Sequence, residues 1–300
     1  MARKPFKLPP FKVEQVFVTN AESTDWGLRH LGIPDLWSKV TGKGIKVAVL
    51  DTGVATMHPD LKDAIDLTQD FSGSKTGAAD LQGHGTHCAG VIGARKNDTG
   101  LIGVAPDCRL YIGKVLGGDG SGGFSQIVAG IRWALKQKVH IISMSLGAPS
   151  GNTELKKAVD DAEKAGVIIV AAAGNEGPGG NTVGYPARYP NTVGVGATDS
   201  NNKVARFSSR GKDVDIVAPG VNILSTYPPR NYAKLSGASM ATPLVAGVCA
   251  LILESRQKQG KPVKSVKEML EILEGHATDI GVPGFDQDTG FGLINPAASL

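Results

Sequence analysis

The sequence predicts a three-layer α/β fold, in which helices cover both faces of a mostly parallel central sheet. Two observations lead to this prediction. Short apolar segments with the length and composition of buried strands alternate with longer segments of helical spacing, as in successive strand–helix–strand units. No linker and no internal repeat divides the 300 residues, so a single large domain with an N-terminal extension is expected.

The individual elements follow from the spacing of apolar residues. A helix is expected at 125–138, where apolar side chains recur every three to four residues. A second, amphipathic helix at 152–165 has Asn152 or Thr153 as its cap. The complete expected order is strand 45–50, strand 110–116, helix 125–138, strand 140–146, helix 152–165, strand 167–172, helix 239–254 and helix 265–274.

Composition narrows the class of protein. A hydrophobic content of 41% and a charged content of 20% suit a buried core and argue against disorder. The net charge of +4 comes without a dense basic block beyond Arg3–Lys4, which argues against nucleic acid as the main partner. Three cysteines are an odd number and do not indicate a disulfide scaffold. With neither an apolar secretion signal nor an 18-residue apolar run, a cytoplasmic chain without a membrane partner is expected.

Three short segments each place a reactive side chain among glycines and small residues. They are Val49–Gly53 with Asp51, His84–Gly90 with His84 and His87, and Gly237–Pro243 with Ser239. Together they supply an orienting carboxylate, a base and a nucleophile, the parts of an acyl-transfer site. Taken singly, Asp51 could simply start a turn and Ser239 could simply cap the helix that follows it.

The histidine segment leaves two questions open. Its spacing does not choose between His84 and His87 as the base, since either imidazole titrates near neutral pH. Two histidines three residues apart could also bind a metal on one helix face. No third ligand follows at a suitable spacing, which argues against zinc.

The three segments, in the order Asp, His, Ser, resemble the motifs of the subtilisin-like serine proteases, and the resemblance extends from about Trp26 to Gly290–Asn295. It implies a subtilisin-like fold over 25–300 and a serine endopeptidase that works through an acyl-enzyme. By this resemblance Asp51 orients the base, His84 is the base and Ser239 is the nucleophile. Asn175 matches the asparagine that helps to hold the oxyanion.

The resemblance also implies a cleft for an extended peptide, bound by main-chain hydrogen bonds to two flanking strands. The alternative for these residues is ordinary loop glycines and a core phenylalanine. Glu176, near the mouth of the pocket for the residue before the scissile bond, would accept Lys or Arg. The implied substrate-binding residues are Gly120, Ser121, Gly122, Phe124, Ser145, Leu146, Gly147, Ala172, Gly174, Glu176 and Gly184.

A structural calcium ion is a further implication of the resemblance, because the family has a calcium loop after the histidine helix. The carboxylate of Asp60, the amide oxygen of Asn97 and Glu22 would provide side-chain oxygens, the ligands that calcium prefers. Backbone carbonyls of Arg95, Thr99 and Leu101 would complete the shell.

Residues 1–24 form a polar, basic, proline-bearing extension that is too short for a folded pro-domain. Within it, Leu8, Pro9, Pro10 and Phe11 resemble the Leu-Ile-Pro-Tyr leader of the intracellular subtilisins, which lies across the active site. Proline fixes φ and lacks an N–H, so it would disturb strand pairing at the scissile bond. We therefore expect residues 1–20 to inhibit the enzyme as a zymogen leader until proteolysis near Asn20–Ala21. The alternative is a frayed tail.

Two departures from the family pattern are Ala238 in place of Thr and Leu244 in place of His. Cys88, four residues after His84, is either a small buried side chain or a thiol sensitive to mercurials. A catalytically silent binding module is the main alternative function, but such relatives usually lose a catalytic residue. An esterase for small molecules is a third. The resemblance to intracellular subtilisins also raises a homodimer.

Overall fold

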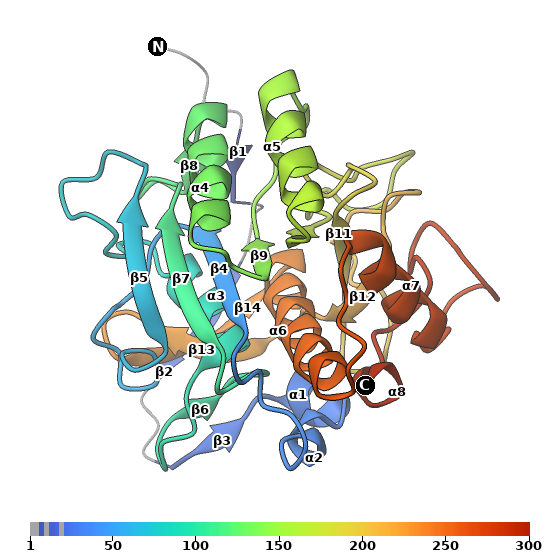
Figure 1. Cartoon of the computed structure of the whole chain (residues 1–300), viewed down its shortest axis with the longest axis horizontal. Helices are drawn as coiled ribbons and strands as arrows, with labels where there is room; N and C mark the ends of the chain where they lie inside the picture. Colours follow the sequence, from blue (N-terminus) through green and yellow to red (C-terminus); the bar gives the residue numbers. More distant parts are fainter. Residues whose placement is uncertain (1–5, 9–11, 18–20) are drawn as a thin grey trace.

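The computed structural model describes residues 6–8, 12–17 and 21–300. A seven-stranded sheet forms its centre, and each pair of neighbouring strands in it is parallel. The strands, several of which are visible side by side in Figure 1, run in the order β12 (Ile216–Pro219), β11 (Val193–Thr198), β10 (Ile168–Ala172), β9 (Ile141–Met144), β4 (Lys46–Asp51), β7 (Arg109–Lys114) and β5 (Ile65–Asp70).

Helices cover both faces of this sheet, which confirms the predicted fold class. Residues of α3 (His84–Gly93) and α6 (Ala238–Lys258) share one hydrophobic core with Val47 and Val49 of β4. Residues of α4 (Phe124–Lys136) and α5 (Thr153–Lys164) share the other core with Ala48 and Leu50. Because successive side chains of a strand point to opposite faces, β4 contributes to both cores, which explains its continuous apolar sequence.

α6 crosses the interior of the molecule. Among the described residues it is the one helix that is long and apolar enough to span a membrane. Of its most apolar stretch of 18 residues, 94% is buried within the protein. Its apolar character is therefore accounted for by the core.

In the described part of the chain, the other elements form three small sheets and four short helices around this frame. The sheets pair β1 (Phe6–Lys7) with β8 (Ser121–Gly122), β3 (Ser23–Thr24) with β6 (Leu101–Ile102), and β13 (Ile223–Tyr227) with β14 (Asn231–Ser236) and β2 (Lys12–Phe17). The helices are α1 (Trp26–His30), α2 (Ile33–Leu36), α7 (Val266–His276) and α8 (Pro296–Ser299).

All eight elements expected from apolar spacing are present, with ends shifted by a few residues. The side chain of Asn152 accepts a hydrogen bond from the N–H of Leu155 at 2.8 Å, so Asn152 is the cap of α5. Three strands of the central sheet were missing from the expectation. They are β5, a largely polar edge strand, β11, whose glycines at 194 and 196 weaken the strand pattern, and β12, which has four residues and ends at Pro219. Each lacks the longer run of large apolar residues that identified the other central strands.

Candidate active site

Three adjacent central strands end at the same edge of the sheet, where ligand crevices form in parallel α/β proteins. Asp51 is the last residue of β4, and the segments that follow β9 and β10 carry Ser145 and Asn175. Helices α3 and α6 bring His84 and Ser239 to these residues, each from the first turn of its helix. The fold thus collects residues that are nearly 190 positions apart in sequence.

Asp51 and His84 form a buried pair. Nδ1 of His84 lies 2.8 Å and 3.0 Å from the two carboxylate oxygens of Asp51, and both side chains are fully buried. Burial by itself would lower the pKa of His84, but the adjacent Asp51 carboxylate raises that pKa well above its usual value of 6.5. The pair therefore fixes the orientation of the ring and stabilises its protonated form.

Asp80 holds the first turn of α3 against the end of β4. One of its carboxylate oxygens accepts hydrogen bonds from the backbone N–H and the hydroxyl of Thr86, at 2.9 Å and 2.6 Å. The other accepts from the hydroxyl of Thr52 at 2.9 Å, and that hydroxyl in turn accepts from the N–H of Gly85. Asp80 satisfies N–H groups that a helix start leaves unpaired, and it fixes His84 relative to Asp51. Sequence reasoning did not identify it; an acidic residue shortly before a helix was the available signal.

Ser239 is fully buried in the described structure and lies against the segment that follows β9. Its Oγ donates to the carbonyl oxygen of Ser145 at 3.3 Å, and Oγ of Ser145 donates to the carbonyl oxygen of Ser239 at 2.9 Å. The side-chain oxygen of Asn175 accepts a hydrogen bond from the N–H of Ala238 at 2.8 Å. The Asn175 amide group is therefore held beside the nucleophile segment, at the positive end of the α6 dipole.

The structure separates the two candidate histidines. His87 is fully buried, and its Nε2 lies 2.9 Å and 3.1 Å from the carbonyl oxygens of Ile223 and Ala233. Burial lowers the pKa of His87 to about 3, which leaves it neutral at ordinary pH. His87 thus connects α3 to β13 and β14, whereas His84 faces the carboxylate.

Cys88 lies between the two helices of the site. Its Sγ is 3.8 Å from Nδ1 of His84 and 3.5 Å from the carbonyl oxygen of Ser239. Burial raises the pKa of this thiol above its usual value, so it is un-ionised at neutral pH. Among the described residues, Asp51, His84 and Cys88 form the one cluster with potential metal-ligating atoms within 4.8 Å of one another.

The N-terminal segment lies in the cleft between the two expected substrate-flanking strands. The N–H of Lys7 donates to the carbonyl oxygen of Gly147 at 3.1 Å, and the N–H of Gly147 donates back to Lys7 at 3.3 Å. On the other side, Lys7 pairs antiparallel with Ser121, and the N–H of Leu8 donates to the carbonyl oxygen of Gly120 at 2.9 Å. The strand contributed by residues 6–8 is thus paired on both of its edges, with Ser145–Gly147 and Gly120–Gly122.

Phe6 anchors this strand, although the sequence-based expectation began at Leu8. Its side chain is fully buried and meets the ring of Phe124 edge-on, with centroids 5.1 Å apart and planes at 85°. The missed signal was the alternation of Phe6 and Leu8 around Lys7, which is the period of a strand. Of the other expected leader residues, Pro9, Pro10 and Phe11 lie outside the described residues.

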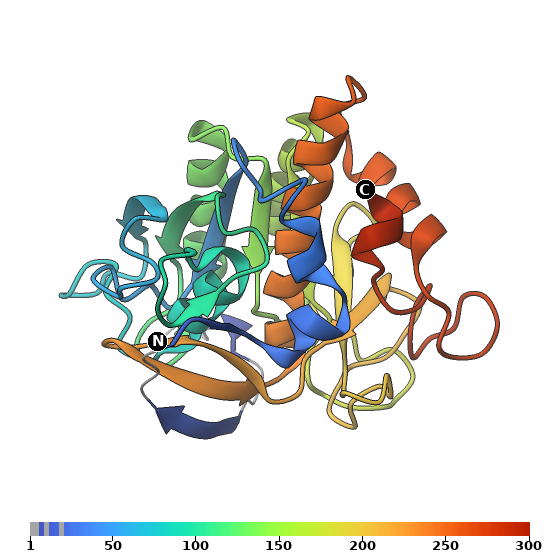
Figure 2. The ribbon, with the colours of Figure 1, turned by 90° about the horizontal axis from the view of Figure 1, so that it is seen from below.

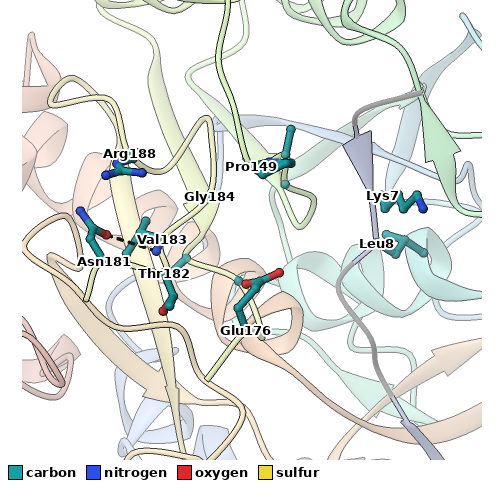
Figure 3. Close-up of a pocket in the computed structure, with 13 residues that line it drawn as sticks. Lys7, Leu8, Pro149, Glu176, Asn181, Thr182, Val183, Gly184 and Arg188 are labelled. Atoms are coloured by element: carbon teal, nitrogen blue, oxygen red, sulfur yellow. Dashed lines mark hydrogen bonds between the residues drawn. The ribbon is translucent and has the colours of Figure 1, made fainter. Parts of the chain in front are cut away.

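A cavity of about 500 Å³ opens beside this strand. Figure 3 shows Lys7 and Leu8 on one side of it, with Gly184, Val183 and Glu176 across from them. Ala173 and Gly174 contribute small walls, whereas Ala172, Ser145 and Leu146 are not among its lining residues. One carboxylate oxygen of Glu176 accepts from Oγ of Ser209 at 2.6 Å, which fixes an acidic group in a pocket that Lys7 and Arg188 also line.

The expected calcium ligands gather around one loop. Asp60, fully buried, accepts hydrogen bonds from the side-chain amide of Asn97 at 3.1 Å and from the N–H of Leu101 at 2.9 Å. Glu22 accepts from the N–H groups of Asn97 and Asp98, at 2.7 Å and 2.9 Å. The expected side-chain ligands are two carboxylates and one amide, whose oxygens suit a hard cation such as calcium. In this structure the amide nitrogen of Asn97 faces Asp60, and the amide oxygen accepts a hydrogen bond from the N–H of Thr99 at 3.1 Å.

Comparison with known proteins identifies close relatives. Residues 42–292 match the subtilase family. Subtilisin Savinase of Lederbergia lenta is 46% identical over 280 residues, which cover 93% of this chain and 99% of that protein. M-protease of Shouchella clausii (strain KSM-K16) is 46% identical over 94% of this chain and 71% of its own length. Subtilisin E of Bacillus subtilis (strain 168) is 44% identical over 93% of this chain and 72% of its own length.

Proposed function

The chain belongs to the subtilase family and is a serine endopeptidase, and from this premise we propose that its own N-terminal leader holds it inactive until proteolysis removes that leader. One observation carries the proposal. The segment Phe6–Leu8 hydrogen-bonds to Gly120 and Gly147 on opposite sides. These main-chain groups are those that an extended peptide substrate would need. The leader and the substrate therefore compete for one cleft.

The Asp51–His84 pair and the place of Asn175 beside the Ser239 segment support the catalytic roles that we assign. His84 takes the proton of the Ser239 hydroxyl as Oγ attacks the carbonyl carbon of the scissile bond, and Asp51 stabilises the resulting imidazolium. The oxyanion of the tetrahedral intermediate is held by the N–H of Ser239 and the side-chain amide of Asn175. His84 then returns the proton to the leaving amine, which leaves an acyl-enzyme on Ser239. Water attacks this ester in the same way, releases the acid and restores the serine.

Two features explain how a bound leader could escape cleavage. The sequence places two prolines directly after Leu8, and a proline has a fixed φ and no N–H with which to continue the strand pairing. The hydroxyl of Ser239 is also engaged with the carbonyl oxygen of Ser145. Both features favour an arrangement in which the leader fills the cleft without presenting a reactive carbonyl to the nucleophile.

The test compares the intact chain with one that begins at Ala21. The shorter chain is expected to cleave casein and to react with a fluorophosphonate at Ser239 from the first time point. The intact chain is expected to show a lag that ends as fragments of residues 1–20 appear by mass spectrometry. A Ser239→Ala variant serves as the control for contaminating protease. Equal activity of the two chains from time zero would contradict inhibition by the leader.

Calcium binding is the second part of the proposal. The side chains of Asp60, Asn97 and Glu22, with backbone carbonyls of Arg95, Thr99 and Leu101, would hold one structural ion. Its binding to the folded state alone would stabilise that state by mass action. A chelator is expected to lower the melting temperature of the Ser239→Ala variant, and Asp60→Asn is expected to abolish that sensitivity. An unchanged melting temperature on chelation would contradict the site.

We also propose that the enzyme is cytoplasmic and forms homodimers. Its three cysteines are free and buried, a state that suits a reducing compartment. Its leader resembles that of the intracellular subtilisins, and the dimer rests on this resemblance. Cell fractionation and light scattering on the Ser239→Ala variant test the two parts. Export of the chain would contradict the first, and a monomeric mass at micromolar concentration would contradict the second.

A further inference from the structure

A tyrosine outside the catalytic residues packs onto the segment that precedes His84. Tyr227 is the last residue of β13, and its half-buried side chain donates a hydrogen bond from the hydroxyl to the carbonyl oxygen of Gln82 at 3.2 Å. Figure 2 shows the orange strands β13 and β14 beside the teal helix α3, which begins at His84. None of the catalytic roles assigned above involves this tyrosine.

The ring of Tyr227 covers Gly83, the N-cap residue of α3. A Cβ atom at position 83 would lie 2.3 Å from Cε2 and 2.4 Å from Cζ of that ring, closer than a side chain can approach. The φ angle of Gly83 is 99°, a value that glycine adopts far more readily than other residues. Glycine at this position therefore permits both the start of the helix and the packing of the tyrosine.

Side chains hold the backbone just before His84 at both its donors and its acceptor. The carboxylate of Asp80 accepts hydrogen bonds from the N–H groups of Gln82 and Gly83, at 3.0 Å and 2.8 Å. Tyr227 binds the carbonyl oxygen of Gln82, and the side-chain oxygen of Gln82 accepts from the N–H of His84 at 2.9 Å. Because the place of an imidazole depends on its backbone, these bonds help to determine where the ring of His84 lies.

The strand that carries Tyr227 is itself fixed to α3. The buried hydroxyls of Ser225 and Thr226 donate to the carbonyl oxygens of His87 and Thr86, each at 2.8 Å. Burial also raises the pKa of Tyr227, so its hydroxyl remains a donor at neutral and mildly alkaline pH. Tyr227 thus reaches the start of α3 from a firmly attached strand.

We propose that Tyr227 is a positioning residue for His84. The inference rests on the proposed function, because it takes His84 as the catalytic base. Tyr227 acts through Gln82 and Gly83, which it holds in the place that keeps the imidazole against Asp51. Without this contact the first turn of α3 shifts, and the imidazole is less well aligned for proton transfer. Misalignment of a base lowers kcat and has less effect on KM.

The first test is Tyr227→Phe, which deletes the hydroxyl and keeps the ring. It uses the enzyme after its leader has been removed by its own processing, with active molecules counted by fluorophosphonate labelling of Ser239. We expect kcat to fall roughly two- to tenfold, the effect of one net hydrogen bond, with KM within twofold of the parent value. The matched control is Tyr189→Phe, because Tyr189 is also half-buried and its hydroxyl donates to the carbonyl oxygen of Asn152 at 3.3 Å. This control should leave kcat unchanged.

The pH profile separates positioning from a general loss of stability. The titratable groups that influence or are influenced by His84 are Asp51, Cys88 and His87, and Tyr227→Phe keeps all three. A looser contact with Asp51 raises the pKa of His84 less. The rise of kcat/KM with pH should therefore move to lower pH in Tyr227→Phe and stay in place in the Tyr189 variant.

The second test is a double-mutant cycle between positions 83 and 227. Gly83→Ala should lower kcat in the parent enzyme, because its Cβ meets the ring of Tyr227. In the Tyr227→Leu background the same change should cost roughly tenfold less, since the ring is gone. The backbone strain of alanine at a φ of 99° is present in both backgrounds and cancels in the cycle. If Gly83→Ala does not fold in the parent, recovery of folded, labelled enzyme in the Tyr227→Leu background is the same result in another form.

A kcat for Tyr227→Phe within twofold of the parent value, or a lower kcat with an unmoved pH profile, would overturn the inference. Equal costs of Gly83→Ala in the two backgrounds would do the same. The role of His84 is decided separately by His84→Ala, which should abolish labelling of Ser239. The proposed function and the role of Tyr227 can therefore fail independently.

Discussion

Phe6→Ala is the substitution that probes leader inhibition most directly. Phe6 is the most completely buried leader residue that the structure describes, and its ring packs edge-on against Phe124 of the cleft. Since Phe6 belongs to the leader and not to the catalytic machinery, its loss should weaken the leader without altering the enzyme.

The expected magnitude follows from two contributions. Complete burial of a phenylalanine side chain stabilises by about 1.5–3 kcal/mol, and an edge-on aromatic pair adds about 0.5–1.5 kcal/mol. The sum, about 2–4.5 kcal/mol, corresponds to a roughly 30- to 2,000-fold weaker inhibition constant. We expect a value at the lower end of this range, because a free peptide already buries part of its apolar surface.

The assay measures inhibition in trans. Synthetic peptides of residues 1–20, with phenylalanine or alanine at position 6, are titrated against leader-free enzyme with a small chromogenic substrate. The matched control is Val13→Ala in the same peptide, because Val13 is 40% exposed and its truncation should change the inhibition constant less than threefold. In the intact chain, Phe6→Ala should also shorten the lag before activity. Inhibition constants within threefold for Phe6→Ala and the parent would refute burial of Phe6 as the source of leader affinity.

Three further predictions concern the site and its surroundings. In the parent enzyme, kcat/KM should rise as pH increases above 6.5, because the raised pKa of His84 delays formation of the neutral base. Asp51→Asn should lower kcat by about 10⁴ and move this rise to lower pH. pH–rate profiles of the two enzymes would show both effects. Cys88→Ser should abolish inhibition by a mercurial, since the thiol lies 3.8 Å from His84 Nδ1, and a parent enzyme that resists the mercurial would exclude this. Burial raises the pKa of Asp215 to about 7, and the nearby Glu274 and Asp213 add to this effect. The folded state therefore favours the protonated form of Asp215. The free energy of unfolding should fall as pH rises from about 4 to about 7. Asp215→Asn, in the Ser239→Ala background, should therefore raise the melting temperature more at pH 8.5 than at pH 5. The corresponding gain in the free energy of unfolding is at most ~4 kcal/mol. An equal change in melting temperature at the two pH values would contradict the assignment.

The fold was predictable where apolar residues are periodic and buried. β4 and α6 have continuous apolar sequences because each is enclosed in the core, so their presence could be inferred without any tertiary information. The catalytic segments were predictable for a different reason. Their chemistry requires particular side chains beside glycines, and the chain order of Asp51, His84 and Ser239 is informative in itself.

Other features depend on contacts that one sequence does not encode locally. His84 and His87 have the same local pattern, and the carboxylate of Asp51 and the carbonyls of β13 and β14 give the two rings different environments. β2 illustrates the same point. Its pairing with β14 joins residues more than 200 positions apart, and no local sequence pattern indicates that pairing.

The covalent connection between the leader and the catalytic domain bears on how inhibition would end. While the leader is covalently attached, its local concentration at the cleft is set by a short connection and is of millimolar order. After a cut between β2 and α1, the freed peptide dilutes to the enzyme concentration, which at micromolar levels is roughly a thousandfold lower, or about 4 kcal/mol. A leader that fills the cleft when tethered is thus released by one cleavage, with no change in any contact. Because each released enzyme can cut further leaders, activation should accelerate itself, and the lag of the intact chain should shorten as its concentration rises.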